Sequence, residues 1–483
     1  MKNLYKITSE YILSRTAYKI LFIISTMLIA VPYIREKIGA ISGVMLVYGF
    51  IIVAYELITG KLLSALRSTK TVWLLGGFAL SYIITILINK THIYGGFRSL
   101  SFMVLMFVLC FLFPQDTTKE KILKEIKLVS ATIIACTFTY SFASFFMYVF
   151  SISGKYFTAN GDYEAYYGMF DSRLWGLYNP NTGATLTILS VLLSIAFLII
   201  NKRKRVRIPL LVNIFIQFSV MLLTGSRAGY YVLAGVIAFC TFFTIAYKMQ
   251  NFTIKTASLS IVSAALSLGL FFAVGAVLRE GLAYLPGVTE YILSENDNTT
   301  ENENGEGEDT ITKIDLNRSD LLETEEQGAF ANRLDIWEAS FEEFLEAPIF
   351  GVGRENLVER AADKFENKQW LYFFKYGSTH NVYLCVLVSS GIIGFLLLGS
   401  FAAITVIRSS KTLVKTYKKV GVWFLMSFVL CLMMYATEFV ETRILYKISI
   451  FGVVFWIYCG YMYKLSKIER IEKSEQLTPN NND

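Results

Sequence analysis

PNTGATLTILSVLLSIAFLII, residues 180–200, is a run of 21 residues without a charged side chain. A helix needs about 20 mostly apolar residues to cross the roughly 30 Å of hydrocarbon in a bilayer. Residues 201–207, which follow directly, carry five Lys and Arg side chains. Because basic connections stay in the cytoplasm, the stretch predicts a spanning helix that ends on the cytoplasmic side.

Eleven other apolar stretches recur along the chain. The chain is 54% hydrophobic and only 17% charged, whereas a soluble domain has about a quarter charged residues. The first stretch is interpreted as a retained span, because no small-residue cleavage site follows it. We therefore expect an all-α polytopic membrane protein of about twelve transmembrane helices, near residues 19–34, 38–59, 71–90, 97–114, 127–151, 180–200, 207–224, 228–247, 255–277, 381–406, 420–440 and 443–463.

The basic residues set the expected orientation. With a cytoplasmic N-terminus, the segments inside carry 27 Lys and Arg residues, and the short segments outside carry 8. This asymmetry predicts that both termini are cytoplasmic and that the protein lies in the plasma or inner membrane. It also explains the net charge of +7 without a nucleic-acid partner.

The spans divide the chain into four expected parts. One of them, a large extracytoplasmic loop, contains an acidic segment at 295–326 with 12 acidic residues, which we expect to be mobile and solvated. Residues 330–345 carry apolar side chains at helical spacing and predict an amphipathic helix on the outer membrane surface. The parts are residues 1–277 with spans one to nine, the loop 278–380, residues 381–463 with the last three spans, and a cytoplasmic tail 464–483.

Metal and disulfide chemistry is not expected. All six cysteines lie within apolar stretches, and none pairs by spacing with another Cys or with a His. Only two histidines exist, His92 and His380. We expect neither a metal nor another cofactor.

Four motifs are predicted to meet at the outer face. An Arg guanidinium is the preferred fork for phosphate oxygens, and His is the usual proton acceptor near neutral pH. Such a set suits a lipid-linked pyrophosphate with a sugar to transfer. The motifs are TGSRAG at 224–229, NRLDIW at 332–337, PIFGVGR at 348–354, and STHNVY at 378–383 followed by SGIIG at 390–394.

This ordered set, between about residues 223 and 398, resembles the O-antigen ligase and Wzy-type O-antigen polymerase family. The resemblance implies a GT-C-like membrane glycosyltransferase that moves glycan from undecaprenyl pyrophosphate to an acceptor hydroxyl without a metal. It also implies that Arg227, Arg333 and His380 are the catalytic residues. Arg354, Asn381, Tyr383 and Arg173 are expected to bind substrate.

Other interpretations of these residues stay open. Arg227 also suits an interfacial Arg that anchors a helix end, and Arg333 suits an ion pair with Asp335 or Glu338 on its own helix. His380 also suits a residue that caps the tenth span, with the help of Asn381.

Glu438, Glu441 and Arg443 are also expected at the outer face. They either pair with one another or contribute a carboxylate to the site, and the sequence does not separate these roles.

The function expected from this pattern is a polysaccharide polymerase for capsule, exopolysaccharide or O-antigen. Donor and acceptor would both be undecaprenyl-pyrophosphate-linked, with inversion at the sugar carbon and with a flippase and a chain-length regulator as protein partners. One alternative is a ligase that moves finished glycan to lipid A core or protein. Another is a flippase or transporter, which predicts charged residues buried at mid-membrane in several spans. The predicted spans contain almost none.

Overall fold

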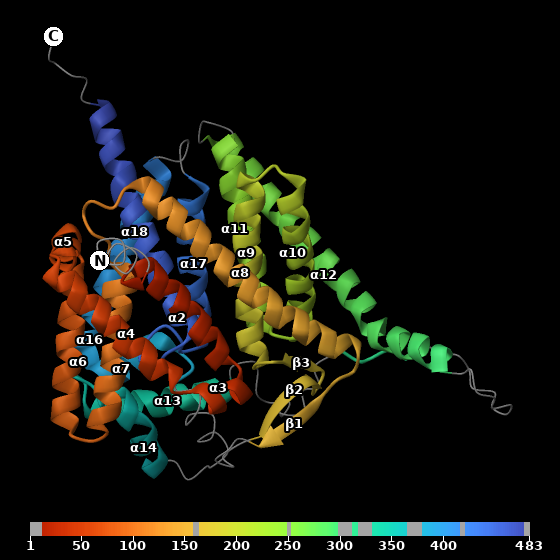
Figure 1. Ribbon diagram of the computed structural model, residues 1–483, viewed down its shortest axis with the longest axis horizontal. Coiled ribbons are helices and arrows are strands. Elements are labelled where there is room, and N and C mark those ends of the chain that lie inside the picture. Colours follow the sequence, from red (N-terminus) through yellow and green to blue (C-terminus); the bar gives the residue numbers. More distant parts are fainter. Residues whose placement is uncertain are drawn as a thin grey trace, which may run out of the picture. The chain divides into compact units, whose positions relative to one another are not determined.

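The computed structural model describes residues 12–157, 164–248, 253–297, 312–316, 331–364, 379–415 and 421–477. These residues are mainly helical and form two compact units (Figure 1). Unit 1 comprises residues 1–30, 38–132 and 323–483, and unit 2 comprises residues 31–37 and 133–322.

Unit 1 contains most of the helices and both ends of the chain. Its elements are α2 (Arg15–Ala30), α4 (Ile41–Ile58), α5 (Lys61–Ser68), α6 (Val72–Asn89), α7 (Ile93–Leu105), the π-helix η2 (Met106–Phe111), the start of α8 (Lys119–Val149), α13 (Ala331–Glu346), α14 (Arg354–Lys364), α16 (Val382–Lys415), α17 (Val422–Thr437) and α18 (Ile450–Leu477).

Unit 2 combines long helices with the only sheet that the described residues form. Its elements are α3 (Pro32–Ile38), the remainder of α8, β1 (Gly154–Phe157), β2 (Glu164–Phe170), β3 (Arg173–Gly176), α9 (Pro180–Ile200), α10 (Lys204–Leu223), α11 (Arg227–Lys248) and α12 (Ile254–Asp297).

Nine helices in the described part of the chain are long and apolar enough to cross a membrane. The number is ten if the broken pair α2 and α3 counts as one span. Every one of the twelve predicted stretches overlaps a helix, so the class of an all-α polytopic membrane protein is confirmed. The first predicted span is broken next to Pro32, where the pyrrolidine ring removes a helix hydrogen bond. The eleventh is only 16 residues long, as α17.

The connection before the last helix is longer than the sequence predicts. The predicted spans 420–440 and 443–463 leave two residues between them, whereas α17 ends at Thr437 and α18 begins at Ile450. The intervening segment contains Glu438, Glu441, Arg443 and Lys447, four charged residues. The Glu438 side chain accepts from the backbone amides of Arg443 and Ile444 in the same segment, which favours an irregular loop over a helix.

The segment between α8 and α9 folds into a small sheet that the sequence did not indicate. β1, β2 and β3 pair antiparallel in chain order, with Gly154 opposite Tyr167 and Phe170 opposite Arg173. Tyr166 stacks on Phe170 with ring centroids 3.8 Å apart. The aromatic residues therefore pack on one another within the sheet, and Arg173 begins its last strand.

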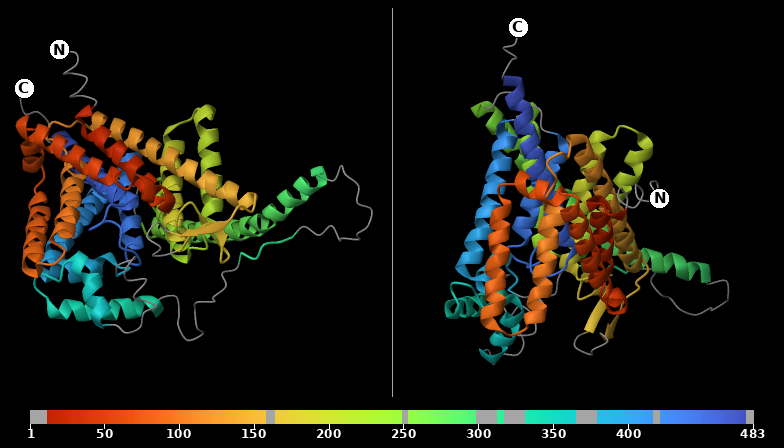
Figure 2. Two further views of the ribbon diagram at one scale, coloured as in Figure 1. Left: turned by 60° about the horizontal axis from the view of Figure 1, so that its bottom comes forward. Right: turned by 60° about the vertical axis from the view of Figure 1, so that its left-hand side comes forward.

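α12 extends well beyond its predicted span of 255–277. Its 44 residues correspond to about 66 Å, roughly twice the hydrocarbon thickness (Figure 2). Residues 312–316 then pack on its distal half. Ile314 donates its amide to the carbonyl of Ala283, and the Lys313 ammonium lies 2.5 Å from the Glu280 carboxylate.

This packing involves part of the acidic segment 295–326, whose mobility stays a prediction. Residues 295–297 belong to α12, and residues 312–316 are fixed on it, with Leu316 only 7% exposed. Ile314 and Leu316 explain this packing, because they are apolar side chains in a mainly acidic segment and become partly or fully buried on α12. The remainder of the segment, at 298–311 and 317–326, lies outside the described residues.

α13 occupies the position where an amphipathic helix is expected. One side is buried through Ile336 and Ala339, which pack with Val352 and Val388. The other side presents apolar residues to the surroundings, namely Leu334 (56% exposed), Phe341 (48%) and Leu345 (61%). An exposed apolar row of this kind suits a helix at a membrane surface.

α16 is interrupted at Gly391, which has φ +64° and ψ −173°. Backbone hydrogen bonds from another segment compensate for the break. Val352 and Gly353 donate to the carbonyls of Val388 and Ser389, and Ile392 donates to the carbonyl of Pro348. The PIFGVGR and SGIIG motifs therefore dock directly on each other, backbone against backbone.

Buried ion pairs lie at the helix ends opposite to this docking point. The Arg15 guanidinium lies 2.6 Å from the Glu56 carboxylate, and the Lys19 ammonium lies 2.6 Å from Glu125. Lys19 is fully buried and the Arg15 and Glu56 side chains nearly so, in contrast to the near absence of charge that the predicted spans suggest. Every one of these charges has a partner, as a structural role in a low-dielectric interior requires.

Candidate functional site

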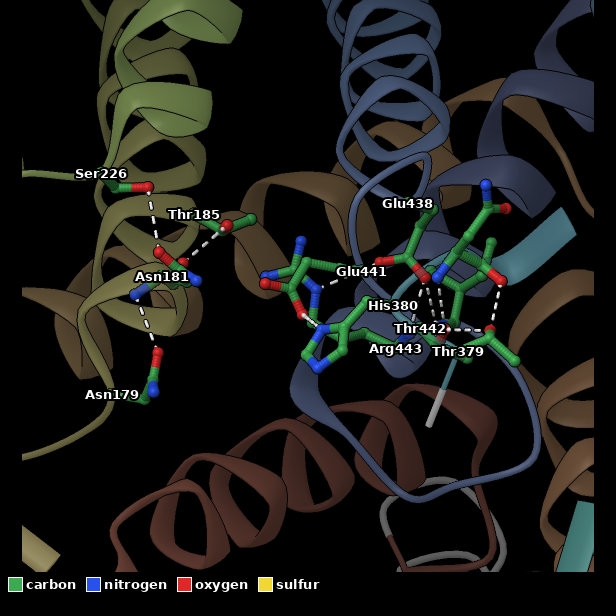
Figure 3. A network of polar contacts seen from close by, with 12 residues as sticks. Asn179, Asn181, Thr185, Ser226, Thr379, His380, Glu438, Glu441, Thr442 and Arg443 are labelled. Carbon is green, nitrogen blue, oxygen red and sulfur yellow. Dashed lines mark hydrogen bonds and ion pairs between the residues drawn. The ribbon is translucent and has the colours of Figure 1, made fainter. Parts of the chain in front are cut away.

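The loop before α16 is held by three neighbouring elements (Figure 3). Asn381 caps α16, because its amide oxygen accepts from the amides of Tyr383 and Leu384 at 3.0 and 3.1 Å. The backbone amide of Asn381 donates to the Thr442 hydroxyl. The Trp337 indole of α13 donates to the carbonyl of Thr379. The cap is therefore Asn381 alone, and the His380 side chain is left for another role.

His380 lies in the left-handed region, with φ +47°, which turns the chain sharply before the helix. Its Nδ1 lies 3.8 Å from Oε2 of Glu441, and both side chains are about one-fifth exposed. This distance exceeds that of a hydrogen bond but permits an ion pair. An imidazole and a carboxylate therefore face each other at a position that solvent reaches.

Glu438 has a different role from Glu441. Its side chain is fully buried and accepts from the amides of Arg443 and Ile444 at 2.6 and 3.2 Å, and from Nε of Arg443 at 3.1 Å. Its carbonyl accepts from the amide of Val382, the first residue of α16. Glu438 therefore folds the loop and ties it to α16.

The pKa values of the two carboxyls move in opposite directions. Burial raises the pKa of Glu438, and the Glu441 charge adds to this rise although Arg443 opposes it. Burial alone would raise the pKa of Glu441 as well, but the attraction of His380, Arg443 and Lys447 outweighs burial and lowers it to about 2. Glu441 is therefore ionised at neutral pH and supplies a fixed negative charge beside His380.

Arg354 and Lys447 place two cations near this pair. Arg354 begins α14, and its amide lies 3.3 Å from the Tyr82 hydroxyl of α6. Burial lowers the pKa of Lys447, and the charge of Arg354 lowers it further. In the described part of the chain neither cation forms an ion pair. The Tyr446 hydroxyl, 2.6 Å from that of Ser390, closes the polar cluster towards α16.

Tyr383 packs in the first turn of α16. Its hydroxyl donates to the carbonyl of Tyr435. Its ring lines an apolar cavity of about 80 Å³ together with residues of α16, α17 and α18, among them Val386, Phe455 and Trp456.

Arg333 lies in the first turn of α13 and is partly exposed. Within the described residues it forms no ion pair with Asp335 or Glu338, so the helix-surface pair that the sequence left open is not formed.

Unit 2 contains the other two candidates, Arg227 and Arg173. The Ser226 hydroxyl accepts from the amide of Gly229 and donates to the amide oxygen of Asn181, so the exposed Arg227 begins α11 from a fixed turn. Nε of Arg173 donates to the carbonyl of Thr224 at 2.9 Å, and its Nη2 donates to Asn181 at 3.1 Å. Arg173 therefore supports the turn that carries Arg227.

Five of the seven candidates lie in unit 1, and two lie in unit 2. Sequence reasoning missed Lys447, because a predicted span covered it, and left Glu441 undecided. A cluster of polar and charged residues within twelve positions was the available signal for both. Among the described residues no group of three or more His, Cys, Asp or Glu is arranged to hold a metal ion, and metal independence stays a prediction.

Comparison with known proteins shows which family the site region resembles. Residues 212–399 match the family model described as O-antigen ligase. The match covers Arg227, Arg333, Arg354 and His380, whereas Glu441 lies outside it. No curated protein matches the sequence. The resemblance that the ordered motifs indicate is confirmed.

Proposed function

For a chain that carries the O-antigen ligase family domain, we propose the activity of a polysaccharide polymerase of the cell envelope. The family implies a glycosyltransferase-like enzyme with lipid-linked glycan substrates. Our proposal adds that donor and acceptor are both undecaprenyl-pyrophosphate-linked and that the site faces away from the cytoplasm. The observation that supports it most is that His380 faces Glu441 at 3.8 Å, with the cations Arg354 and Lys447 nearby.

In the proposed reaction, His380 takes the proton from the acceptor hydroxyl. The hydroxyl oxygen forms a bond to the anomeric carbon of the donor sugar, and the bond from that carbon to the pyrophosphate oxygen breaks with its electron pair leaving on the pyrophosphate. Attack opposite to the leaving group inverts the sugar carbon. Glu441 holds the imidazole and stabilises its protonated form, as the carboxylate of a catalytic triad does.

The leaving pyrophosphate needs positive charge more than it needs a proton. Arg227 and Arg333 supply planar donor forks at the start of two helices. Arg354 and Lys447 add charge beside His380. Catalysis is then mainly positioning and charge stabilisation, with no metal required.

We expect Arg227→Lys and Arg333→Lys each to lower the transfer rate about tenfold or more, because Lys keeps the charge but loses the bidentate fork. Initial rates with a lipid-linked donor measure the effect. Arg205→Lys, an exposed Arg at the opposite end of α10, is the matched control and should behave as wild type. Unchanged rates in the Lys and Ala variants of both residues would exclude the pyrophosphate role.

Glu441→Gln is expected to slow transfer about tenfold or more. The neutral amide no longer stabilises the positive charge that develops on the imidazole as it takes the acceptor proton. Glu359→Gln removes the exposed carboxylate beside His92 and is the control. A lower rate matched by an equally lowered thermal stability in detergent would mean that Glu441 only supports the fold.

The reaction itself is tested with purified protein and a lipid-linked repeat unit. A ladder of longer lipid-linked products supports a polymerase. A ligase is the second candidate because the matched family model is described by that activity, and it would instead transfer one preformed glycan to a lipid A core or protein acceptor. Movement of the lipid across vesicles without any new glycosidic bond would overturn both proposals in favour of a flippase.

A further inference from the structure

Unit 1 contains a second group of cations, far from His380 along α16. Arg408 follows Val382, the first residue of α16, by 26 residues, which corresponds to about 39 Å along this candidate span. This separation exceeds the roughly 30 Å of membrane hydrocarbon. The end of α16 near Arg408 therefore lies at the opposite membrane face from the proposed active site. The neighbouring end of α18 carries Lys464, Lys467 and Arg470.

These cations are held in place by neutral groups. The Arg408 guanidinium lies 4.8 Å from the centre of the Tyr463 ring and donates to its hydroxyl at 3.1 Å. Arg470 donates to the carbonyl of Arg408 and to the Thr412 hydroxyl at 2.6 and 2.9 Å. Lys467 donates to the carbonyl of Ser68 at 2.9 Å. The side chains of Arg408, Lys467 and Arg470 are thus oriented by neutral groups.

The available carboxylates do not balance the group. None of these cations forms an ion pair within the part of the chain that the structure describes, and Glu469 is bound to Lys119 at 3.0 Å. The charges instead repel one another, since Lys467 faces Arg408 and Lys70, and Arg470 faces Arg408. The enclosed Nε of Arg408 also lacks a hydrogen-bond partner. Gathered cations without a counter-charge indicate a site for an external anion.

We propose that Arg408, Lys467, Arg470 and Lys70 bind the phosphate of an acidic phospholipid in the leaflet opposite to the active site. Arg and Lys are the usual donors to phosphate oxygens. Basic groups between helices at the cytoplasmic surface bind acidic lipid head groups. The lipid would bridge α16, α18 and the turn between α5 and α6.

The test measures binding of a short-chain phosphatidylglycerol to the full-length protein in neutral detergent. Wild type should bind it in preference to phosphatidylcholine, and Arg408→Gln with Lys467→Gln should weaken that binding about tenfold or more. The control, Lys61→Gln with Arg67→Gln, removes two cations of α5 that are exposed and should bind as wild type. Equal binding by the Arg408/Lys467 variant and the control would overturn the proposal.

Two further measurements separate the remaining outcomes. Lys70→Gln with Arg470→Gln changes only exposed side chains, so its loss of lipid binding supports the proposal even if the first variant does not fold. Inorganic pyrophosphate is then added to wild type as a competitor. If it binds as tightly as the lipid and displaces it, the site takes a soluble phosphate compound and the lipid assignment is wrong.

Discussion

Replacing His380 with alanine is expected to lower glycan transfer by about 10²–10⁴-fold, the usual contribution of a positioned base. A sugar hydroxyl is a poor nucleophile, and in the proposed reaction no other group takes its proton. His380→Ala should leave protein yield and donor binding close to wild type, because the side chain faces Glu441 at 3.8 Å but does not cap α16. Initial rates and donor binding are measured on the same preparations.

His92→Ala provides an unusually close control. His92 also has a left-handed backbone, with φ +46°, and also pairs with a glutamate, because its Nε2 lies 2.6 Å from Glu359. Any general effect of removing such a histidine should therefore appear in both variants. If both retain wild-type activity, His380 is not the base. Since Glu441 is ionised, it would then be the first candidate to replace His380.

Gly391→Ala is expected to destabilise the folded protein by about 3 kcal/mol or more. A backbone at φ +64° and ψ −173° is essentially restricted to glycine, and forcing another residue into it costs about 1–3 kcal/mol. The added Cβ would also lie 2.2 Å from the carbonyl oxygen of Ile349, so the docked segment must move. Thermal unfolding in detergent and the yield of monodisperse protein measure the effect.

Gly399→Ala is the matched control on the same helix. No atom lies within 4 Å of a Cβ added there, and alanine favours a helix over glycine by about 0.5–1 kcal/mol. Its stability should equal or exceed that of wild type. Equal stability of the Gly391 and Gly399 variants would show that the break in α16 does not depend on glycine.

The membrane fold was predictable because hydrophobic length is a local property. Residues 180–200 match the bounds of α9, since nothing outside that stretch is needed to define it. The prediction was wrong where charged side chains bind backbone amides that a helix would otherwise use. The segment after Thr437 was assigned to spans on its apolar content, yet Glu438 binds the amides of Arg443 and Ile444 and unwinds it.

The candidate site was predictable in its motifs but not in its contacts. Glu441 follows His380 by 61 residues, and hydropathy says nothing about which loops meet at one face. The PIFGVGR and SGIIG motifs were predicted to meet at the outer face, without any defined contact between them. Their direct docking depends on the positive φ of Gly351 and Gly391. The sequence does not reveal this requirement, because it does not show that the two segments lie against each other.

The hydrogen bond from the amide of Val382 to the carbonyl of Glu438 has a consequence for the order in which the protein is made and folds. When a nascent chain has just inserted α16, His380 is already synthesised, but Glu438, Glu441 and Thr442 still follow in the ribosome. The carboxylate that faces His380 and the hydroxyl that holds the backbone amide of Asn381 arrive only after α17 has been synthesised. The proposed site is thus complete only near the end of translation.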